Sequence, residues 1–246
     1  MSADGHGNGN GNGNGNGSKN HLLERLDQPQ SSTKKAIRVV VADDHSFIRE
    51  GVRLILERDG YEVIADAADG RQAVRLVEEH VPDIALLDVS MPRLNGLDAG
   101  RQIIQIFSGR VAIVLLTVHE EQDHVVEAIH AGVRGYVVKS QGITDLTRAM
   151  REVASGGIYL SPSVCGVLVG AYLAGVRTPS DPLSVREREV LQLVAEGKTT
   201  KEVGTTLGIS TKTAEWYRAR LMDKLHIHDT AGLVRYALRR GLIELS

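Results

Sequence analysis

The sequence of 246 residues has little of several features that mark whole classes of protein. It contains one cysteine, Cys165, which excludes an internal disulfide framework and a cysteine-based zinc cluster and favours a reducing compartment. Its longest apolar stretch, residues 164–176, includes three glycines and is too short to span a bilayer. The N-terminal residues lack the apolar run of a secretory signal peptide. We therefore expect a cytoplasmic protein that does not associate with a membrane.

The formal net charge of −2 conceals an uneven distribution along the chain. Residues 182–246 contain 11 Lys and Arg against 8 Asp and Glu, whereas residues 1–181 contain 18 against 23. An acidic N-terminal part and a basic C-terminal part favour two domains with different partners, the C-terminal one suited to a polyanion. An excess of three positive charges does not by itself establish DNA binding.

The first 36 residues differ from the rest in composition. They open with a Gly-Asn alternation over residues 7–17 and contain almost nothing apolar to bury. Such a segment is typical of a disordered tail, and we assign it no function.

Residues 37–155 alternate between two patterns. Short β-branched runs occupy residues 37–42, 61–64, 84–87, 111–116 and 135–138, and amphipathic stretches occupy residues 47–56, 70–79, 96–106, 123–130 and 144–154. The alternation predicts an α/β fold, a doubly wound, five-stranded parallel sheet of the flavodoxin-like kind. A ligand site in such a sheet lies at the carboxyl ends of the strands.

Residues 156–181 are interpreted as a linker with a connecting helix, and residues 182–246 as a small all-α domain. Capping-box pairs at Ser184 and Glu187 and at Thr199 and Glu202 predict two helix starts. Further helix signals are Gly197 at a helix end, Gly208 in a turn, and Ser210 and Asp229 as N-caps. Four short helices with these boundaries are typical of a helix-turn-helix domain.

Polar residues stand at the ends of four of the expected strands: Asp43, Asp44, Asp88, Thr117 and Lys139. In a parallel sheet these side chains meet at one edge, where clustered carboxylates require a hard cation such as Mg²⁺. One carboxylate can then act as a nucleophile toward phosphorus, while a hydroxyl and an ammonium stabilise the transferred group. Any one of these residues alone is more often a turn former or a solvated charge, but the ordered set indicates a site.

These motifs resemble those of CheY-like receiver domains. The resemblance rests on residues 41–45 (VADDH), 87–92 (LDVSMP), 95–96 (NG), 116–117 (LT) and 136–139 (YVVK). It implies that Asp88 is the phosphoacceptor and that Asp43, Asp44, Asp88 and the Ser90 carbonyl hold Mg²⁺. It also implies a switch pair of Thr117 and Tyr136, phosphoryl binding by Lys139, and tuning of the phosphoryl lifetime by Ser90 and His119.

The rear block resembles a LuxR-type helix-turn-helix through residues 183–191, 197–203 and 207–213, and the whole chain resembles the NarL/FixJ family. The resemblance implies a two-component response regulator that regulates transcription and has no enzymatic activity beyond self-phosphorylation and slow autodephosphorylation. Its implied partners are a sensor histidine kinase, a double-stranded DNA operator, a second copy of the chain upon activation, and RNA polymerase.

The expected recognition helix, residues 211–225, turns Ala214, Leu221 and Leu225 toward the bundle, with Tyr217 alongside. A mixed-charge helix face is usually only solvated, but the turn and the positive charge favour DNA contact here. The candidate DNA-binding residues are Lys201, Thr211, Lys212, Glu215, Trp216, Arg218, Ala219, Arg220 and Lys224. The candidate dimerisation residues, on the last helix, are Leu233, Val234, Ala237 and Leu238.

Two other functions share parts of this pattern. A flavodoxin-like FMN binder needs a phosphate-binding loop after the first strand, where residues 43–45 (DDH) would repel a phosphate unless a metal were present. A regulator that works without phosphorylation would not need the complete set of Asp43, Asp44, Asp88, Thr117 and Lys139.

Overall fold

The computed structural model describes residues 5–7, 9, 36–118, 122–173 and 182–243. Residues 36–246 form one compact unit. Almost all of the tail expected to be disordered lies outside the described residues. Among the helices that the structure describes, none is both long enough and apolar enough to cross a bilayer.

The predicted parallel sheet is confirmed, with one strand more than expected. Strands β1 (Arg38–Ala42), β2 (Glu62–Ala67), β3 (Ile84–Asp88), β4 (Ala112–Thr117), β5 (Gly135–Val138) and β6 (Tyr159–Leu160) are arranged in the order β2-β1-β3-β4-β5-β6. All neighbouring strands are parallel. Strand β6 lies within residues 156–181, which the sequence predicts to be a linker with a connecting helix. A two-residue strand is too short to produce an alternating pattern, so the sequence does not indicate it.

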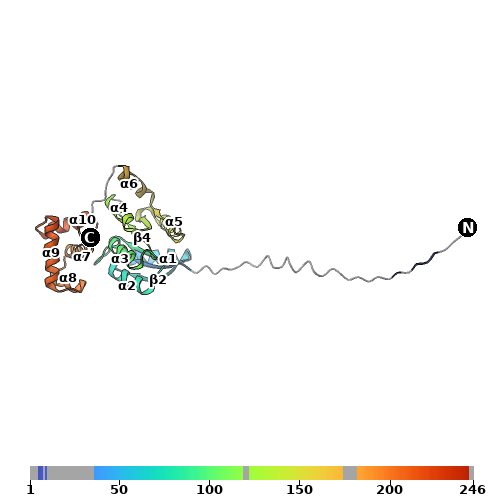
Figure 1. Ribbon diagram of the computed structural model, residues 1–246, viewed down its shortest axis with the longest axis horizontal. Helices are drawn as coiled ribbons and strands as arrows, with labels where there is room; N and C mark the ends of the chain where they lie inside the picture. The colour runs from blue at the N-terminus through green and yellow to red at the C-terminus, as the bar shows by residue number, and fades with distance from the viewer. Residues whose placement is uncertain (1–4, 8, 10–35, 119–121, 174–181, 244–246) are drawn as a thin grey trace. The chain divides into compact units, whose positions relative to one another are not determined.

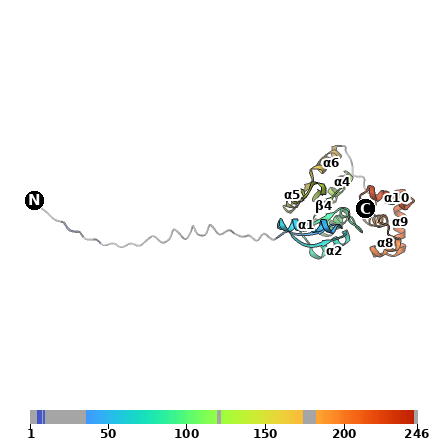
Figure 2. The ribbon, with the colours of Figure 1, turned by 180° about the vertical axis from the view of Figure 1, so that it is seen from behind.

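Helices cover both faces of the sheet (Figures 1 and 2). Helices α1 (Ser46–Arg58) and α5 (Ile143–Ala154) pack on one face, and α2 (Gly70–His80), α3 (Gly96–Phe107) and α4 (Gln122–Ala131) pack on the other. The expected connecting helix is α6 (Pro162–Leu173), which packs beside α4. A short 3₁₀ turn, Lys139–Gln141, follows β5.

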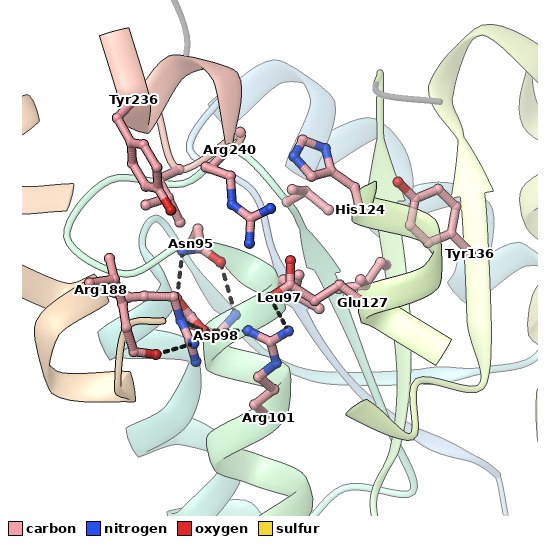
Figure 3. A pocket seen from close by; sticks show the side chains of 15 residues that line it. Asn95, Leu97, Asp98, Arg101, His124, Glu127, Tyr136, Arg188, Tyr236 and Arg240 are labelled. Carbon is pink, nitrogen blue, oxygen red and sulfur yellow. Dashed lines mark hydrogen bonds and ion pairs between the residues drawn. The ribbon is translucent and has the colours of Figure 1, made fainter. Parts of the chain in front are cut away.

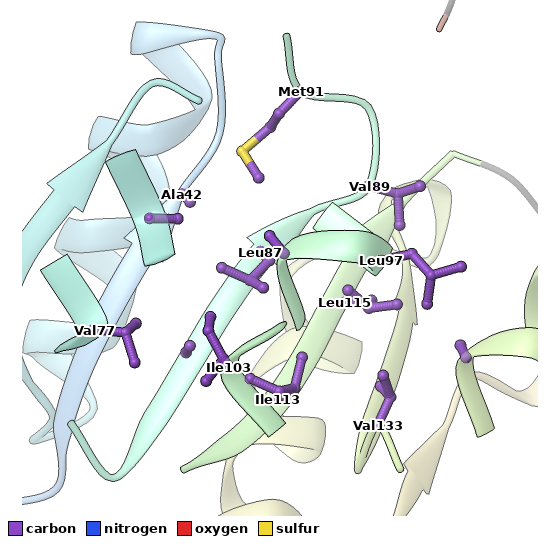
Figure 4. Packing of buried hydrophobic residues seen from close by; sticks show 14 of the residues in the cluster. Ala42, Val77, Leu87, Val89, Met91, Leu97, Ile103, Ile113, Leu115 and Val133 are labelled. Atoms are coloured by element: carbon purple, nitrogen blue, oxygen red, sulfur yellow. The ribbon is translucent and has the colours of Figure 1, made fainter. Parts of the chain in front are cut away.

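The core explains why the central strands read as unbroken apolar runs. Every residue of β3 is buried, and Leu87 of β3 and Leu115 of β4 belong to the same cluster as Ile103 of α3 (Figure 4). Burying one such aliphatic side chain contributes about 1.5–3 kcal/mol to the stability of the folded state. A sheet covered on both faces thus leaves its strand ends as the positions for polar chemistry.

The second domain consists of α7 (Val185–Ala195), α8 (Thr200–Leu207), α9 (Thr211–Leu225) and α10 (Thr230–Arg239). Both predicted capping boxes are present, at the starts of α7 and α8. Gly208 ends α8 in the left-handed conformation at φ 65°, and Ser210 and Asp229 cap α9 and α10 as predicted. Ala214 and Leu221 are buried in the core of this domain, so α9 turns the expected face inward.

Candidate functional site: an acidic pocket and a helix-turn-helix

The sheet register brings the predicted carboxylates to one edge. Ala42 pairs with Leu87, so that Asp43, which follows β1, lies beside Asp88, which ends β3. Ligand atoms of Asp43, Asp44, His45 and Asp88 all lie within 4.8 Å of one another. Asp43 and Asp88 are buried, whereas Asp44 and His45 are exposed at the rim.

Lys139 completes this pocket from the far side. Its Nζ lies 2.9 Å from Asp43 Oδ2 and 2.9 Å from Asp88 Oδ1. Burial acts to lower the pKa of the Lys139 ammonium, but the Asp88 and Asp43 carboxylates outweigh it and raise that pKa above its usual value. The ammonium therefore stays charged next to the two carboxylates.

The charge balance of the pocket fits a divalent cation. Burial raises the pKa of Asp88 to about 6; Lys139 opposes the rise, and Asp43 and Asp44 add to it. One ammonium beside three carboxylates leaves excess negative charge, and carboxylate oxygens are the ligands that hard cations prefer. The pocket can therefore hold a metal ion, with Ser90 placed two residues beyond Asp88.

The remaining pocket residues lie on neighbouring strands. Thr117 ends β4 and pairs with Val138, which directly precedes Lys139, so its hydroxyl-bearing side chain stands at the same sheet edge. Tyr136 of β5 is buried within the core of the α/β domain. His119 lies outside the described residues.

The loop after Asp88 is confined by Gly96, which belongs to the NG motif at residues 95–96. A Cβ added to Gly96, the first residue of α3, would lie 2.0 Å from the Asp88 carbonyl oxygen. The Gly96 N–H donates to the Val89 carbonyl over 2.9 Å. Only glycine lets the helix start approach the strand end this closely.

Gly96→Ala is therefore expected to lower the free energy of unfolding by about 1–3 kcal/mol, because the backbone at Asp88 must move. Gly51→Ala is the matched control: Gly51 lies inside α1, and nothing approaches its added Cβ within 4 Å. That change is expected to be neutral or to stabilise the fold by up to about 1 kcal/mol. Urea unfolding of both variants measures the difference, and equal stabilities would contradict this reading of the loop.

The same loop is bound by a side chain of the helical domain. Gln192 of α7, fully buried, donates from Nε2 to the Met91 carbonyl over 2.8 Å and accepts at Oε1 from the Asn95 N–H over 2.9 Å. Glu196 accepts from the Arg93 N–H over 2.8 Å. The backbone polar groups of the loop are thus satisfied by α7.

Ion pairs continue this contact along α3. Arg188 Nε of α7 lies 2.8 Å from Asp98 Oδ1, and Arg101 Nη1 lies 2.9 Å from the same oxygen (Figure 3). A cavity of about 20 Å³, room for about one water molecule, lies beside them and is also lined by Tyr136 and, from α10, Tyr236. The helical domain therefore reaches both the loop after Asp88 and the surroundings of Tyr136.

The exposure of the predicted DNA-binding residues divides them in two. Exposed side chains are those of Lys201, Thr211, Lys212, Glu215, Trp216, Ala219 and Arg220. Arg218 and Lys224 are half-buried and have protein partners: Arg218 Nη2 donates to Thr230 Oγ1 over 2.7 Å, and Lys224 Nζ lies 2.6 Å from Glu187 Oε2. The outward face of α9 is thus centred on Trp216, whose residue surface is 52% exposed.

The predicted dimerisation set needs correction. Leu233 and Ala237 have no exposed surface, because they form part of the core of the helical domain. Two of the four predicted dimerisation residues therefore pack inside their own domain. Of the four, only Val234 and Leu238, which are half-buried, have surface that a second copy could contact.

A doubly wound domain with an acidic pocket, joined to a helix-turn-helix domain, defines a class of regulatory proteins, and comparison with known proteins identifies the family. The family described as response regulator receiver domain matches residues 39–151, and the bacterial regulatory proteins of the luxR family match residues 181–237. The chain belongs to the response regulators that join a receiver domain to a LuxR-type DNA-binding domain.

Individual relatives agree with this assignment. The chain is 35% identical over 211 residues to the transcriptional regulatory protein MctR of Rhizobium johnstonii, covering 84% of this chain and 95% of MctR. It is 34% identical over 209 residues to the response regulator UvrY of Escherichia coli K12, with the same coverage. The structure of RcsB from Salmonella enterica serovar Typhimurium, bound to a promoter with the phosphomimetic BeF₃⁻, has a TM-score of 0.52 at 26% identity, covering 81% of this chain and 97% of RcsB.

Proposed function

We propose that a sensor histidine kinase phosphorylates Asp88 and that this phosphorylation controls sequence-specific DNA binding by α9. The observation that carries the proposal is the position of the loop from Met91 to Asn95, which begins three residues after Asp88 and is bound by Gln192 of α7. One short segment therefore connects the acidic pocket with the DNA-binding domain.

The chemistry in the pocket follows from its residues. An Asp88 carboxylate oxygen attacks phosphorus, a P–O bond forms, and the P–N bond of the kinase phosphohistidine breaks. Lys139, now held by Asp43 and Asp88, is placed to pair with the phosphoryl oxygens, and the Thr117 hydroxyl is placed to donate to one of them. Asp43, Asp44, Asp88 and the Ser90 carbonyl would hold Mg²⁺, which neutralises negative charge when bound.

The change in the pocket has two routes to the DNA-binding domain. Removal of Lys139 from Asp88 alters the charge around the strand end that leads into the Gln192-bound loop. Movement of Thr117 toward the phosphoryl group opens space near Tyr136, which lines the same cavity as Tyr236 of α10 and Arg240, the residue that follows this helix. Both routes end on helices that carry no base-reading residues, so the control acts through domain contact.

The regulator that we propose binds a double-stranded operator through α9 in the major groove. The solved complex of RcsB with a promoter supports DNA binding by similarity. The recognition helix of a helix-turn-helix lies in the major groove, which supports the role of α9. A two-fold operator, a homodimer formed upon phosphorylation and an interaction with RNA polymerase complete the proposal, and all place the protein in the compartment that holds the DNA, the cytoplasm.

We expect some contacts of α9 to contribute affinity for any duplex and others to contribute discrimination between DNA sequences. Lys212, exposed in the first turn, is suited to a phosphate, so Lys212→Ala is expected to weaken binding to all duplexes and to lower the log–log salt slope by about one unit. Trp216→Ala is expected to spare non-specific binding and to cost about 1–3 kcal/mol of discrimination. Salt titrations on a selected and a random duplex separate the two; equal losses in both variants would contradict the division.

The phosphorylation step is tested by incubating the full chain with acetyl phosphate and Mg²⁺ and measuring intact mass. We expect the mass of one added phosphoryl group, absent when the divalent cation is chelated. An unchanged mass under both conditions would favour a regulator that works without phosphorylation, and a bound flavin in the purified protein would favour the FMN-binding alternative.

A further inference from the structure

The exposed face of α9 contains a stacked pair that is joined to a buried carboxylate. The Arg220 guanidinium carbon lies 5.0 Å from the centroid of the Trp216 ring, one helical turn earlier. On its other side, Arg220 Nε lies 3.2 Å from Glu187 Oε1. A cation within about 6 Å of an indole ring is attracted to its face, so Arg220 links the ring to the carboxylate.

Glu187 is held firmly in place. Its side chain is only 2% exposed, and Oε2 accepts from the Ser184 N–H over 2.8 Å and from Lys224 Nζ over 2.6 Å. Burial alone would raise the pKa of the Glu187 carboxyl, but Lys224 and Ser184 hold that pKa below its usual range. The carboxylate is therefore charged, buried and bonded on several sides, which makes it a fixed anchor.

The role of Glu187 in the capping box of α7 does not explain why its carboxylate is buried and paired with two cations. Glu202 occupies the same capping-box position in α8, with the Thr199 N–H donating to it over 2.8 Å. Glu202 is exposed, and its bonded partner among the described contacts is Thr199. Glu187 differs because it also reaches two cations of α9, Arg220 and Lys224.

We propose that Glu187 is a positioning residue for DNA recognition: through Arg220 it fixes the Trp216 ring on the outward face of α9. This inference rests on the proposed function, because it assigns the purpose of the fixed ring to base reading. A ring that is already ordered before DNA arrives loses less conformational freedom upon binding, and so it contributes more to affinity for the correct sequence.

The full chain contains one tryptophan and six tyrosines, so fluorescence excited at a wavelength that tyrosine does not absorb reports Trp216 alone, without any DNA. Glu187→Gln keeps an amide oxygen for the cap and removes the charge that holds Arg220. We expect its acrylamide quenching constant to rise to the value of Arg220→Gln, and the double variant to show no further rise. Glu202→Gln, the matched control, is expected to quench like the wild-type protein.

Wild-type quenching in Glu187→Gln together with raised quenching in Arg220→Gln would overturn the proposal, as would additive changes in the double variant. Where Glu187→Gln fails to fold, Glu187→Asp keeps the charge, shortens its reach and is expected to show the same rise. In DNA binding, Glu187→Gln is expected to reduce discrimination between selected and random duplexes by about tenfold. A mobile ring with unchanged discrimination would uphold the positioning of Trp216 and contradict only its role in base reading.

Discussion

Asp88→Asn is expected to abolish phosphoryl transfer from acetyl phosphate, because an amide oxygen is a far poorer nucleophile than a carboxylate oxygen. Asp88 ends β3 at the point where Asp43, Asp44 and Lys139 meet. The variant should show no mass gain under conditions in which the wild-type protein gains one phosphoryl group. Intact-mass measurement over time gives the answer directly.

Asp83→Asn is the matched control for that experiment. Asp83 precedes the same strand at its opposite end, where its carboxylate accepts from the Arg38 N–H over 2.8 Å. An amide oxygen can keep that bond, so the fold is expected to persist and labelling to match the wild-type protein. Undiminished labelling of Asp88→Asn would show that another group accepts the phosphoryl, and the account of the pocket would be wrong.

Gln192→Leu is expected to uncouple the two domains. The leucine side chain has a similar volume but cannot bond the Met91 carbonyl or the Asn95 N–H, each a buried group that costs about 1–3 kcal/mol when left unpaired. Coupling between distant sites commonly changes affinity about 5- to 150-fold. We expect the ratio of DNA affinities with and without the phosphoryl group to fall toward one in this variant.

Gln102→Leu is the control that distinguishes the effect of the loop contact from the effect of weakening any contact between the two domains. Gln102 of α3 also bonds α7, and its described hydrogen bond runs from Nε2 to Glu189 Oε1 over 2.9 Å rather than to the loop. This variant is expected to retain most of the phosphorylation response. If Gln192→Leu retains the complete response, or if both variants lose it equally, the loop is not the route between the domains.

The sequence was most informative where one physical cause dominates. Doubly buried strands must be apolar throughout, so β1, β3 and β4 were evident, and the polar residues that follow them had to meet at the sheet edge. Both capping boxes were predicted as well, because the Ser184–Glu187 and Thr199–Glu202 pairs are local. Local chemistry and strict periodicity leave few alternatives.

What was missed depends on contacts between distant segments. Gln192 and Asp98 look like ordinary polar residues of amphipathic helices, yet both are buried where α7 meets the receiver domain. The pattern on α10 shows apolar residues but does not show which partner they cover, so it cannot reveal that Leu233 is buried within its own domain. Strand β6 is recruited by pairing with β5 rather than by its own sequence.

The most direct test of phosphorylation-controlled DNA binding is the affinity of the full chain for a duplex selected from a random library, measured by fluorescence anisotropy with and without BeF₃⁻ and Mg²⁺. We expect BeF₃⁻ to tighten binding by the wild-type protein at least about fivefold and to leave Asp88→Asn unchanged. Equal affinities of the wild-type protein in both conditions, or the same response in Asp88→Asn, would contradict the account.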